Sequence, residues 1–219
     1  FSNLIMYDRQ TETWWQQATG DAIAGTLTGS QLRAVPASII AWSDFATAHP
    51  EGQVLSRQTG FNRSYGENPY VGYDDVNRPP FLYRGPETSD SLPPVARVLT
   101  VELGGEAVAY PYETLRTIGV ANDVVGGAPI SVFWIEGTVS ALDAATVAGG
   151  RDVGASAAFE RTLGDRTLTF ARDGDRIIDT ETGSTWDILG QAVAGPLQGS
   201  RLTPVVAINH FWFSWSVFR

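Results

Sequence analysis

The chain contains two histidines, the side chain that most often moves protons or binds transition metals near neutral pH. Their positions form neither an HxxxH nor an HxH pair, so the sequence holds no histidine-based metal motif. His49 precedes Pro50 at the end of an expected helix, where a histidine suits the last helical carbonyls. His210 lies in an aromatic segment beside Asn209, and it is the first candidate catalytic group. A hydrogen-bonded histidine at the edge of the core is the alternative.

Asp8 and Asp179 occupy matched positions, each three residues before a threonine. An aspartate in this position suits a turn in which its carboxylate accepts from the backbone ahead. Two carboxylates brought together by the fold would instead permit general acid–base chemistry. Both interpretations stay open. The enzymatic hypothesis is a hydrolase or redox site that joins His210, Asp179 and the 63–75 segment.

The same segment is rich in hard oxygen ligands of the kind that Ca²⁺ prefers. Their spacing is not that of an EF-hand loop, so a calcium-stabilised structural domain is a weaker alternative, and no other cofactor is predicted. The candidate ligands are Glu67, Asn68, Asp74 and Asp75.

Aromatic rings next to arginines are typical of surfaces that grip a peptide, a sugar or another subunit. The alternative is that these side chains pack over a sheet. The candidates for partner binding are Arg63, Tyr65, Tyr70, Tyr73, Trp14 and Trp15.

Other chemistries find little support in the sequence. Cysteine is absent, and there is no GxSxG, P-loop or GxGxxG motif. The net charge of −9 disfavours binding of a phosphate backbone, so nucleic acid is not an expected partner. No apolar run approaches the roughly 18 to 20 residues that cross a bilayer, so we expect a soluble chain without a transmembrane segment.

The elements that must position these residues come from an internal duplication. Residues 20–32 (GDAIAGTLTGSQL) match 190–202 (GQAVAGPLQGSRL) at eight of thirteen positions, where chance gives about one. With a one-residue shift, Trp15 matches Trp186. The first copy lacks a counterpart of 97–178, so we expect about 80 to 90 further N-terminal residues in the intact product, with a partial duplication as the alternative.

Short alternating segments and Gly or Asp turns predict a mainly β fold with a few short helices. Hairpins are expected around GGEA, VVGG and DGD, and helices at 41–52 and at YETLRTIG. The expected organisation is residues 1–56 as the end of the first copy, 57–96 as a Tyr-, Pro- and Gly-rich connection, and 97–219 as the second copy, all in one compact body.

Several blocks, among them RSYGENPYVGY, ETGSTWDILGQAVAGPL and HFWFSW, make the chain resemble the DUF3179 family of bacterial and archaeal proteins. The resemblance spans almost the whole chain and implies an exported or membrane-anchored protein of unassigned function. It also implies an upstream Cys-Pro-x-Cys motif, whose counterpart in the second copy, 131–143, has no cysteine. We therefore expect a non-catalytic, extracytoplasmic binding or assembly module whose partner is another protein or subunit.

Overall fold

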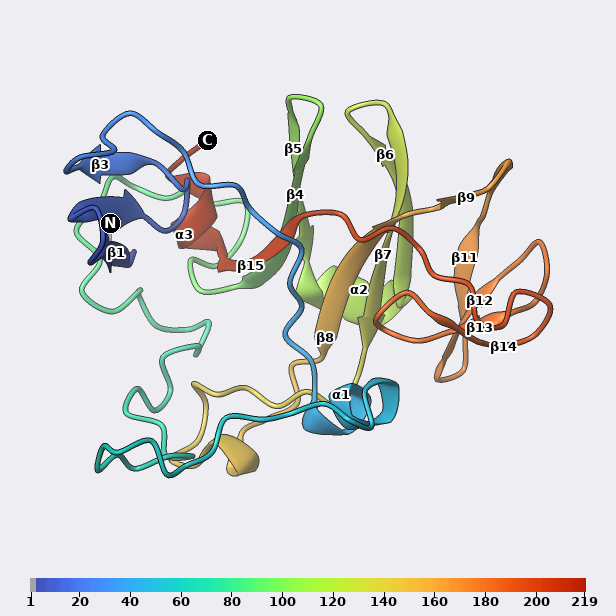
Figure 1. The fold of residues 1–219 in the computed structure, drawn as a ribbon, viewed down its shortest axis with the longest axis horizontal. Helices are drawn as coiled ribbons and strands as arrows, with labels where there is room; N and C mark the ends of the chain where they lie inside the picture. Colours follow the sequence, from blue (N-terminus) through green and yellow to red (C-terminus); the bar gives the residue numbers. More distant parts are fainter. Residues whose placement is uncertain (1–2) are drawn as a thin grey trace.

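The computed structural model describes residues 3–219 and is rich in short antiparallel strands, which confirms the predicted fold class. The strands form the sheets β1-β2-β3, β15-β4-β5, β6-β7-β8, β11-β12-β13-β14 and the two-stranded β10-β9. Three short helices and one 3-10 turn accompany them (Figure 1). The first third of the chain contributes β1 (Ile5–Asp8), β2 (Thr13–Gln16), β3 (Ala22–Ala24) and α1 (Trp42–Ala48). The remaining elements are β4 (Arg97–Leu103), β5 (Glu106–Pro111), α2 (Tyr112–Ile118), β6 (Val120–Val125), β7 (Ala128–Ile135), the 3-10 turn Val147–Gly149, β8 (Ala155–Glu160), β9 (Thr162–Leu163), β10 (Arg166–Thr167), β11 (Phe170–Asp173), β12 (Arg176–Asp179), β13 (Thr185–Trp186), β14 (Ala192–Ala194), β15 (Ala207–Phe211) and α3 (Trp212–Ser216).

The centre of the molecule consists of two glycine-tipped hairpins, β4–β5 and β6–β7, as the GGEA and VVGG patterns predict. The tips touch each other: a Cβ on Gly104 would lie only 2.7 Å from the carbonyl oxygen of Gly126. Glycine is therefore required at this close approach. Between the sheets β15-β4-β5 and β6-β7-β8 lies a core that includes Leu99, Val132 and Trp134. Helix α2 packs against both sheets.

A second core joins the central strand β7 to the sheet β11-β12-β13-β14. Phe170 packs against both Phe133 and Trp186, with ring centroids 5.0 and 5.5 Å apart. Phe133, Phe170 and Trp186 are all buried, so this aromatic column fixes the C-terminal sheet on the body.

The two matched segments adopt the same local backbone. Trp15 pairs with Ala22 and Trp186 with Ala192, and each pairing has a register shift at the residue before the tryptophan. The glycines that follow, Gly25 and Gly195, have φ of +108° and +93°, which only glycine adopts readily. The segments thus share a turn geometry, while their origin by gene duplication remains a prediction.

The predicted helices form, with shorter bounds than expected. The helix expected over 41–52 is limited to α1, ending before Pro50. The YETLRTIG helix is α2, which ends at Gly119 with φ of +73°. The aromatic C-terminal segment contains the end of β15 and then α3.

Within residues 3–219, no helix combines the length and the apolar character needed to cross a membrane.

Candidate functional site

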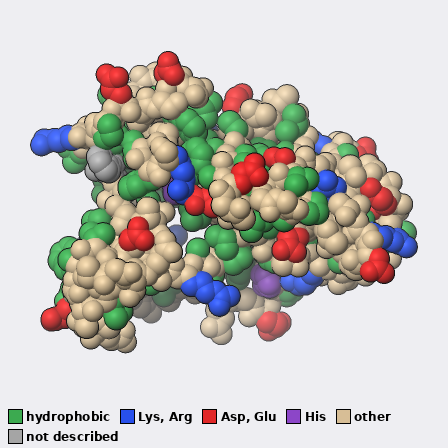
Figure 2. All heavy atoms as spheres, turned by 90° about the horizontal axis from the view of Figure 1, so that it is seen from above, with side chains coloured by type: hydrophobic (Ala, Val, Ile, Leu, Met, Phe, Trp, Pro, Cys, Tyr) green, Lys and Arg blue, Asp and Glu red, His purple; other side chains and the backbone are tan. Residues whose placement is uncertain are grey.

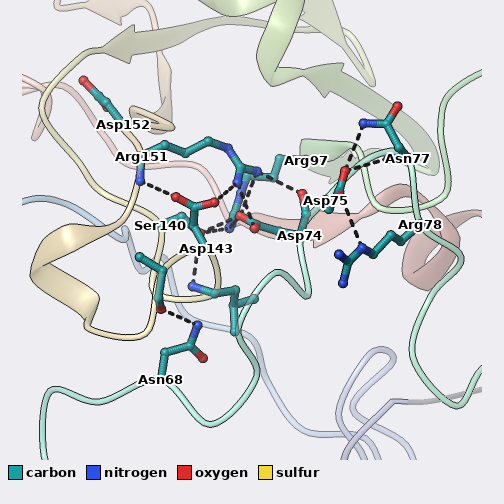
Figure 3. A network of polar contacts seen from close by, with 12 residues as sticks. Asn68, Asp74, Asp75, Asn77, Arg78, Arg97, Ser140, Asp143, Arg151 and Asp152 are labelled. Carbon is teal, nitrogen blue, oxygen red and sulfur yellow. Dashed lines mark hydrogen bonds and ion pairs between the residues drawn. The ribbon is translucent and has the colours of Figure 1, made fainter.

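The best-connected polar cluster is centred on Asp74, whose side chain is fully buried. Its Oδ2 accepts from Arg97 Nη2 at 2.7 Å and from Ser140 Oγ at 2.5 Å, and Arg151 donates to Oδ1 at 3.1 Å. Arg151 also forms an ion pair with Asp143 (Figure 3). Positive and negative groups alternate through the cluster, which makes the buried charge tolerable.

Three separate parts of the chain supply this cluster. Arg97 begins β4, Asp74 belongs to residues 63–83, which we call the tyrosine loop, and the other members lie on the connection between β7 and β8 at residues 136–154. The tyrosine loop contains no helix or strand, yet its backbone is fastened to that connection. The amide of Asn68 donates to the carbonyl of Ala145 at 2.8 Å, and that of Gly72 to the carbonyl of Asp143 at 2.9 Å.

The electrostatics of Asp74 follow from these contacts. Burial by itself would raise the pKa of its carboxyl group, but the hydrogen bond from Ser140 and the guanidinium groups of Arg97 and Arg151 outweigh burial. The pKa of Asp74 therefore lies below its ordinary value, and the carboxylate is ionised at neutral pH.

Between the tyrosine loop and Leu142 of the 136–154 connection lies a hollow of about 590 Å³, which we call the aromatic hollow. Its wall is apolar: it is lined by Tyr70, Tyr73, Phe81, Leu82 and Leu142. Tyr70, Phe81 and Leu82 are 55%, 56% and 68% exposed. Because the three side chains line one hollow, they form a continuous area of exposed apolar surface.

A second hollow of about 400 Å³, the inner hollow, lies between the end of β15, the start of β4 and the 136–154 connection. Apolar side chains such as Ile39, Val153 and Phe211 form much of its wall. The polar groups on the wall belong to Arg97, Tyr112, Thr138, Ser140, Asn209 and His210.

A larger groove of about 930 Å³ runs past the other side of Arg97. Its arginines are Arg97, Arg116 and Arg151, and its acidic residues are Asp74, Asp75, Glu113, Asp143 and Asp152. Since acidic groups outnumber arginines, this groove is not suited to a phosphate backbone. Figure 2 shows acidic and basic side chains scattered over one face, with hydrophobic side chains exposed between them.

Three of the four candidate calcium ligands have side chains that are engaged in other contacts. Asp74 pairs with two guanidinium groups. Asp75 accepts from the backbone amide of Asn77 and pairs with Arg78. The side-chain amide of Asn68 donates to the carbonyl of Ala144 at 2.9 Å. Glu67 pairs through its backbone with Thr146. Among residues 3–219, no three His, Cys, Asp or Glu side chains form a group able to hold a metal ion.

The structure does not bring Asp8 and Asp179 together: β1 and β12 lie near opposite ends of the long axis (Figure 1). Each aspartate instead stabilises its own turn. The backbone amide of Thr182 donates to Asp179 Oδ1 at 2.7 Å, and the Trp186 indole donates to Oδ2 at 2.9 Å. At Asp8, hydrogen bonds from the Thr11 hydroxyl and the Gln10 amide hold the pKa below its ordinary value. The turn interpretation accounts for both residues.

The two histidines have different surroundings. His49 is exposed and its ring lies 5.2 Å from that of Phe45 on α1. His210, on β15, lines the inner hollow, and β15 lies apart from the C-terminal sheet that contains Asp179 (Figure 1). Burial lowers the pKa of His210 to about 4, so its ring is neutral at pH 7. The structure therefore separates Asp179 from His210, whereas Phe211, next to His210, contacts Tyr73 of the tyrosine loop with ring centroids 5.6 Å apart.

The aromatic candidates are also divided. Tyr70 and Tyr73 line the aromatic hollow, and Tyr65, 39% exposed, donates or accepts a short hydrogen bond with Thr59. Arg63 is exposed on the same loop. Trp14 and Trp15 belong instead to β2, where Trp15 is buried and Trp14 packs on Tyr7 with centroids 5.4 Å apart.

Sequence reasoning missed the residues that build the site around Asp74. Arg97, Ser140, Asp143 and Arg151 share no motif, and Asp74 contacts partners 23, 66 and 77 positions away. The density of turn residues and tyrosines in the loop was the one usable signal.

The comparisons with known proteins place the chain in a family. A family model described as "Protein of unknown function (DUF3179)" matches residues 1–219. The chain belongs to the DUF3179 family. This confirms the resemblance drawn from the sequence blocks. No curated protein and no solved structure matches the chain.

Two of the blocks that carry the DUF3179 resemblance meet at the site. RSYGENPYVGY ends at Tyr73, and HFWFSW contains Phe211; their rings lie 5.6 Å apart. The guanidinium carbon of Arg97 lies 5.2 Å from the centre of the Phe211 ring, which connects this aromatic contact to the Asp74 cluster.

Proposed function

We propose that this DUF3179 protein is a non-catalytic binding module that works outside the cytoplasm and holds an apolar segment of another protein at the aromatic hollow. One observation carries the proposal. The tyrosine loop is anchored to the body by polar groups, while apolar side chains such as Tyr70, Phe81 and Leu82 remain exposed.

This arrangement favours binding for an energetic reason. A flexible loop would lose conformational entropy when a partner ordered it, whereas an anchored loop has lost that entropy during folding. Tyr70 and Tyr73 are of the residue type enriched among the contacts that dominate protein interfaces. Their rings, 6.3 Å apart, form part of a wall against which an apolar side chain can pack.

The charge of the chain indicates which partner segments fit best. The net charge is −9, so basic residues that flank the apolar contact would be attracted over a long range and would speed association. The extracytoplasmic location rests on the family resemblance rather than on the geometry of the site.

The placement of the candidate catalytic residues supports binding over catalysis. Asp8 and Asp179 are each committed to a turn, and they lie far from each other. General acid–base catalysis requires such groups within hydrogen-bond reach of one substrate.

Selection of displayed dodecapeptides on the immobilised chain tests the proposal. We expect enriched peptides to be apolar with basic flanks, and the double variant Tyr70→Ala/Leu82→Ala to bind them at least about tenfold more weakly. Because both side chains are more than half exposed, the melting temperature should change little.

The matched control is Tyr7→Ala/Leu4→Ala, which removes side chains of similar exposure (49% and 62%) in β1 and directly before it. This variant should bind the selected peptides like the unchanged protein. Equal binding by both double variants, or a library without enrichment, would contradict the proposed role of the aromatic hollow.

A further inference from the structure

Two residues that line the inner hollow carry a buried polar atom without a hydrogen-bond partner in the described part of the chain. Thr138 is only 7% exposed, and within residues 3–219 its hydroxyl has no hydrogen-bond partner. The Nε of Arg97 is likewise buried without a partner in this part of the chain. An unpaired buried polar group costs free energy, so folded proteins rarely retain one without a reason.

A third donor on this wall is the side-chain amide of Asn209, which is oriented by a hydrogen bond from Tyr112. The Tyr112 hydroxyl donates to Asn209 Oδ1, which occupies the amide oxygen and leaves the Asn209 amide hydrogens to another acceptor. Tyr112 is half-buried, and burial raises its pKa to about 12, so it remains a donor at neutral pH.

The donors on the wall favour a ligand that accepts hydrogen bonds. Arg97 is the charged residue among the lining side chains, which include no aspartate or glutamate; its Nη2 pairs with Asp74 behind the wall, so Nε is the donor left for a ligand. His210 is kept neutral by burial and adds no charge at pH 7. The rest of the wall is mostly aliphatic or aromatic, including Ile39, Val139 and Phe211.

We propose that the inner hollow binds a small organic acid with an apolar body, whose carboxylate accepts from Arg97, Thr138 and Asn209. The volume of about 400 Å³ lies within the range of small-molecule sites in proteins. A carboxylate supplies the acceptor lone pairs that these donors lack, and charge-assisted bonds to arginine are among the stronger hydrogen bonds. The aliphatic wall shields the rest of the ligand from water.

Two probes of nearly equal shape test the assignment: phenylacetate and its neutral analogue phenylacetamide. Titration followed by amide NMR spectra should give saturable shifts for the hollow with phenylacetate and at least tenfold weaker binding of the amide. The variant Thr138→Val keeps the shape of the side chain and removes the hydroxyl. We expect it to weaken phenylacetate binding at least fivefold.

We expect Thr138→Val to fold normally, because the hydroxyl that it removes makes no hydrogen bond in the described part of the chain. Its melting temperature should equal or exceed that of the unchanged protein. Thr162→Val, at an exposed position on β9, is the matched control and should leave phenylacetate binding unchanged. A second variant, Asn209→Leu, should weaken binding in the same direction.

Unsaturable phenylacetate shifts, equal binding of the two probes, or equal affinity in Thr138→Val would each overturn the assignment. The proposal is independent of the peptide-binding role, since Tyr70→Ala/Leu82→Ala should bind phenylacetate normally. Loss of phenylacetate binding in Tyr70→Ala/Leu82→Ala would contradict the assignment of the inner hollow and the aromatic hollow as separate sites.

Discussion

Arg97 Nη2 lies 2.7 Å from Asp74 Oδ2, and this ion pair ties the first residue of β4 to a loop without regular secondary structure. Its acceptor is fully buried, whereas the Arg97 side chain is 27% exposed. An ion pair between two exposed side chains contributes little to stability. A buried carboxylate, in contrast, depends on its partners for the solvation that water would otherwise provide. The pair therefore adds to the backbone hydrogen bonds that hold the tyrosine loop on the body.

Replacement of Asp74 by asparagine should destabilise the protein by about 3 kcal/mol, because it leaves Arg97 and Arg151 without their shared counter-ion. Chemical denaturation measures this loss. Peptide binding at the aromatic hollow should weaken as well, since the loop would no longer be held in its binding conformation.

Asp75→Asn is the control for this experiment. Asp75 is the next residue on the same loop, and its partner Arg78 is 68% exposed, so the variant should leave stability nearly unchanged. Comparable losses in the two variants would show that burial of Asp74 has no special effect.

The sequence predicts that residues near 63–75 matter, but it cannot predict the ion-pair cluster. Asp74 is interpretable from its neighbours only as a hard oxygen ligand, since the arginines that surround it lie 23 and 77 positions away. Contacts at such separations depend on how the sheets pack. The same limit explains why Thr138, Tyr112 and Asn209 carry no visible signal until the inner hollow is formed.

Glycine positions in the C-terminal sheet separate backbone strain from steric contact. A Cβ on Gly195, where φ is +93°, would lie 2.7 Å from Ser184 Cα, whereas one on Gly199, at +88°, would meet nothing within 4 Å. We expect Gly195→Ala to cost about 3 kcal/mol and Gly199→Ala about 1 kcal/mol. In thermal unfolding, each kcal/mol should lower the melting temperature by about 2–4 °C. Equal effects would argue against the close approach at Ser184.

These glycines also show why the fold was more predictable than the site. Turn formation depends on local φ and on hydrogen bonds a few residues apart, such as Gly199 N to the carbonyl of Ala192 at 2.9 Å. Such information is contained in short segments, so the hairpins at GGEA, VVGG and DGD could be predicted from sequence. Which hairpins pack together could not.

Calcium should have little effect on stability, because the oxygens of Asp74 already accept from Arg97, Arg151 and Ser140. A cation would have to displace two guanidinium groups. We expect equal melting temperatures in millimolar calcium chloride and in excess chelator at constant ionic strength. A rise of several degrees with calcium, absent in Asp75→Asn, would instead support a calcium site in the tyrosine loop.

The free energy of unfolding should fall as the pH decreases from 6.5 to about 4, the range in which burial keeps His210 unprotonated in the folded chain. Its pKa is lowered by burial from an ordinary 6.5 to about 4, so between these values the unfolded chain binds a proton that the folded chain excludes. The folded state therefore loses up to about 3 kcal/mol as the pH falls from 6.5 to 4, and this contribution is constant above that window. Asp74, with a lowered pKa, loses its stabilising contribution only below its ordinary value of 3.8.

Urea unfolding at several pH values measures this slope. His210→Gln should remove most of it while Arg97 and Tyr112, which line the same hollow, are kept. The chain has one other histidine, so His49→Gln, at an exposed position, is a matched control and should retain the slope. A slope that survives in His210→Gln would mean that His210 is hydrated and takes up its proton in the folded state, and the inner hollow would then carry a positive charge at mildly acidic pH.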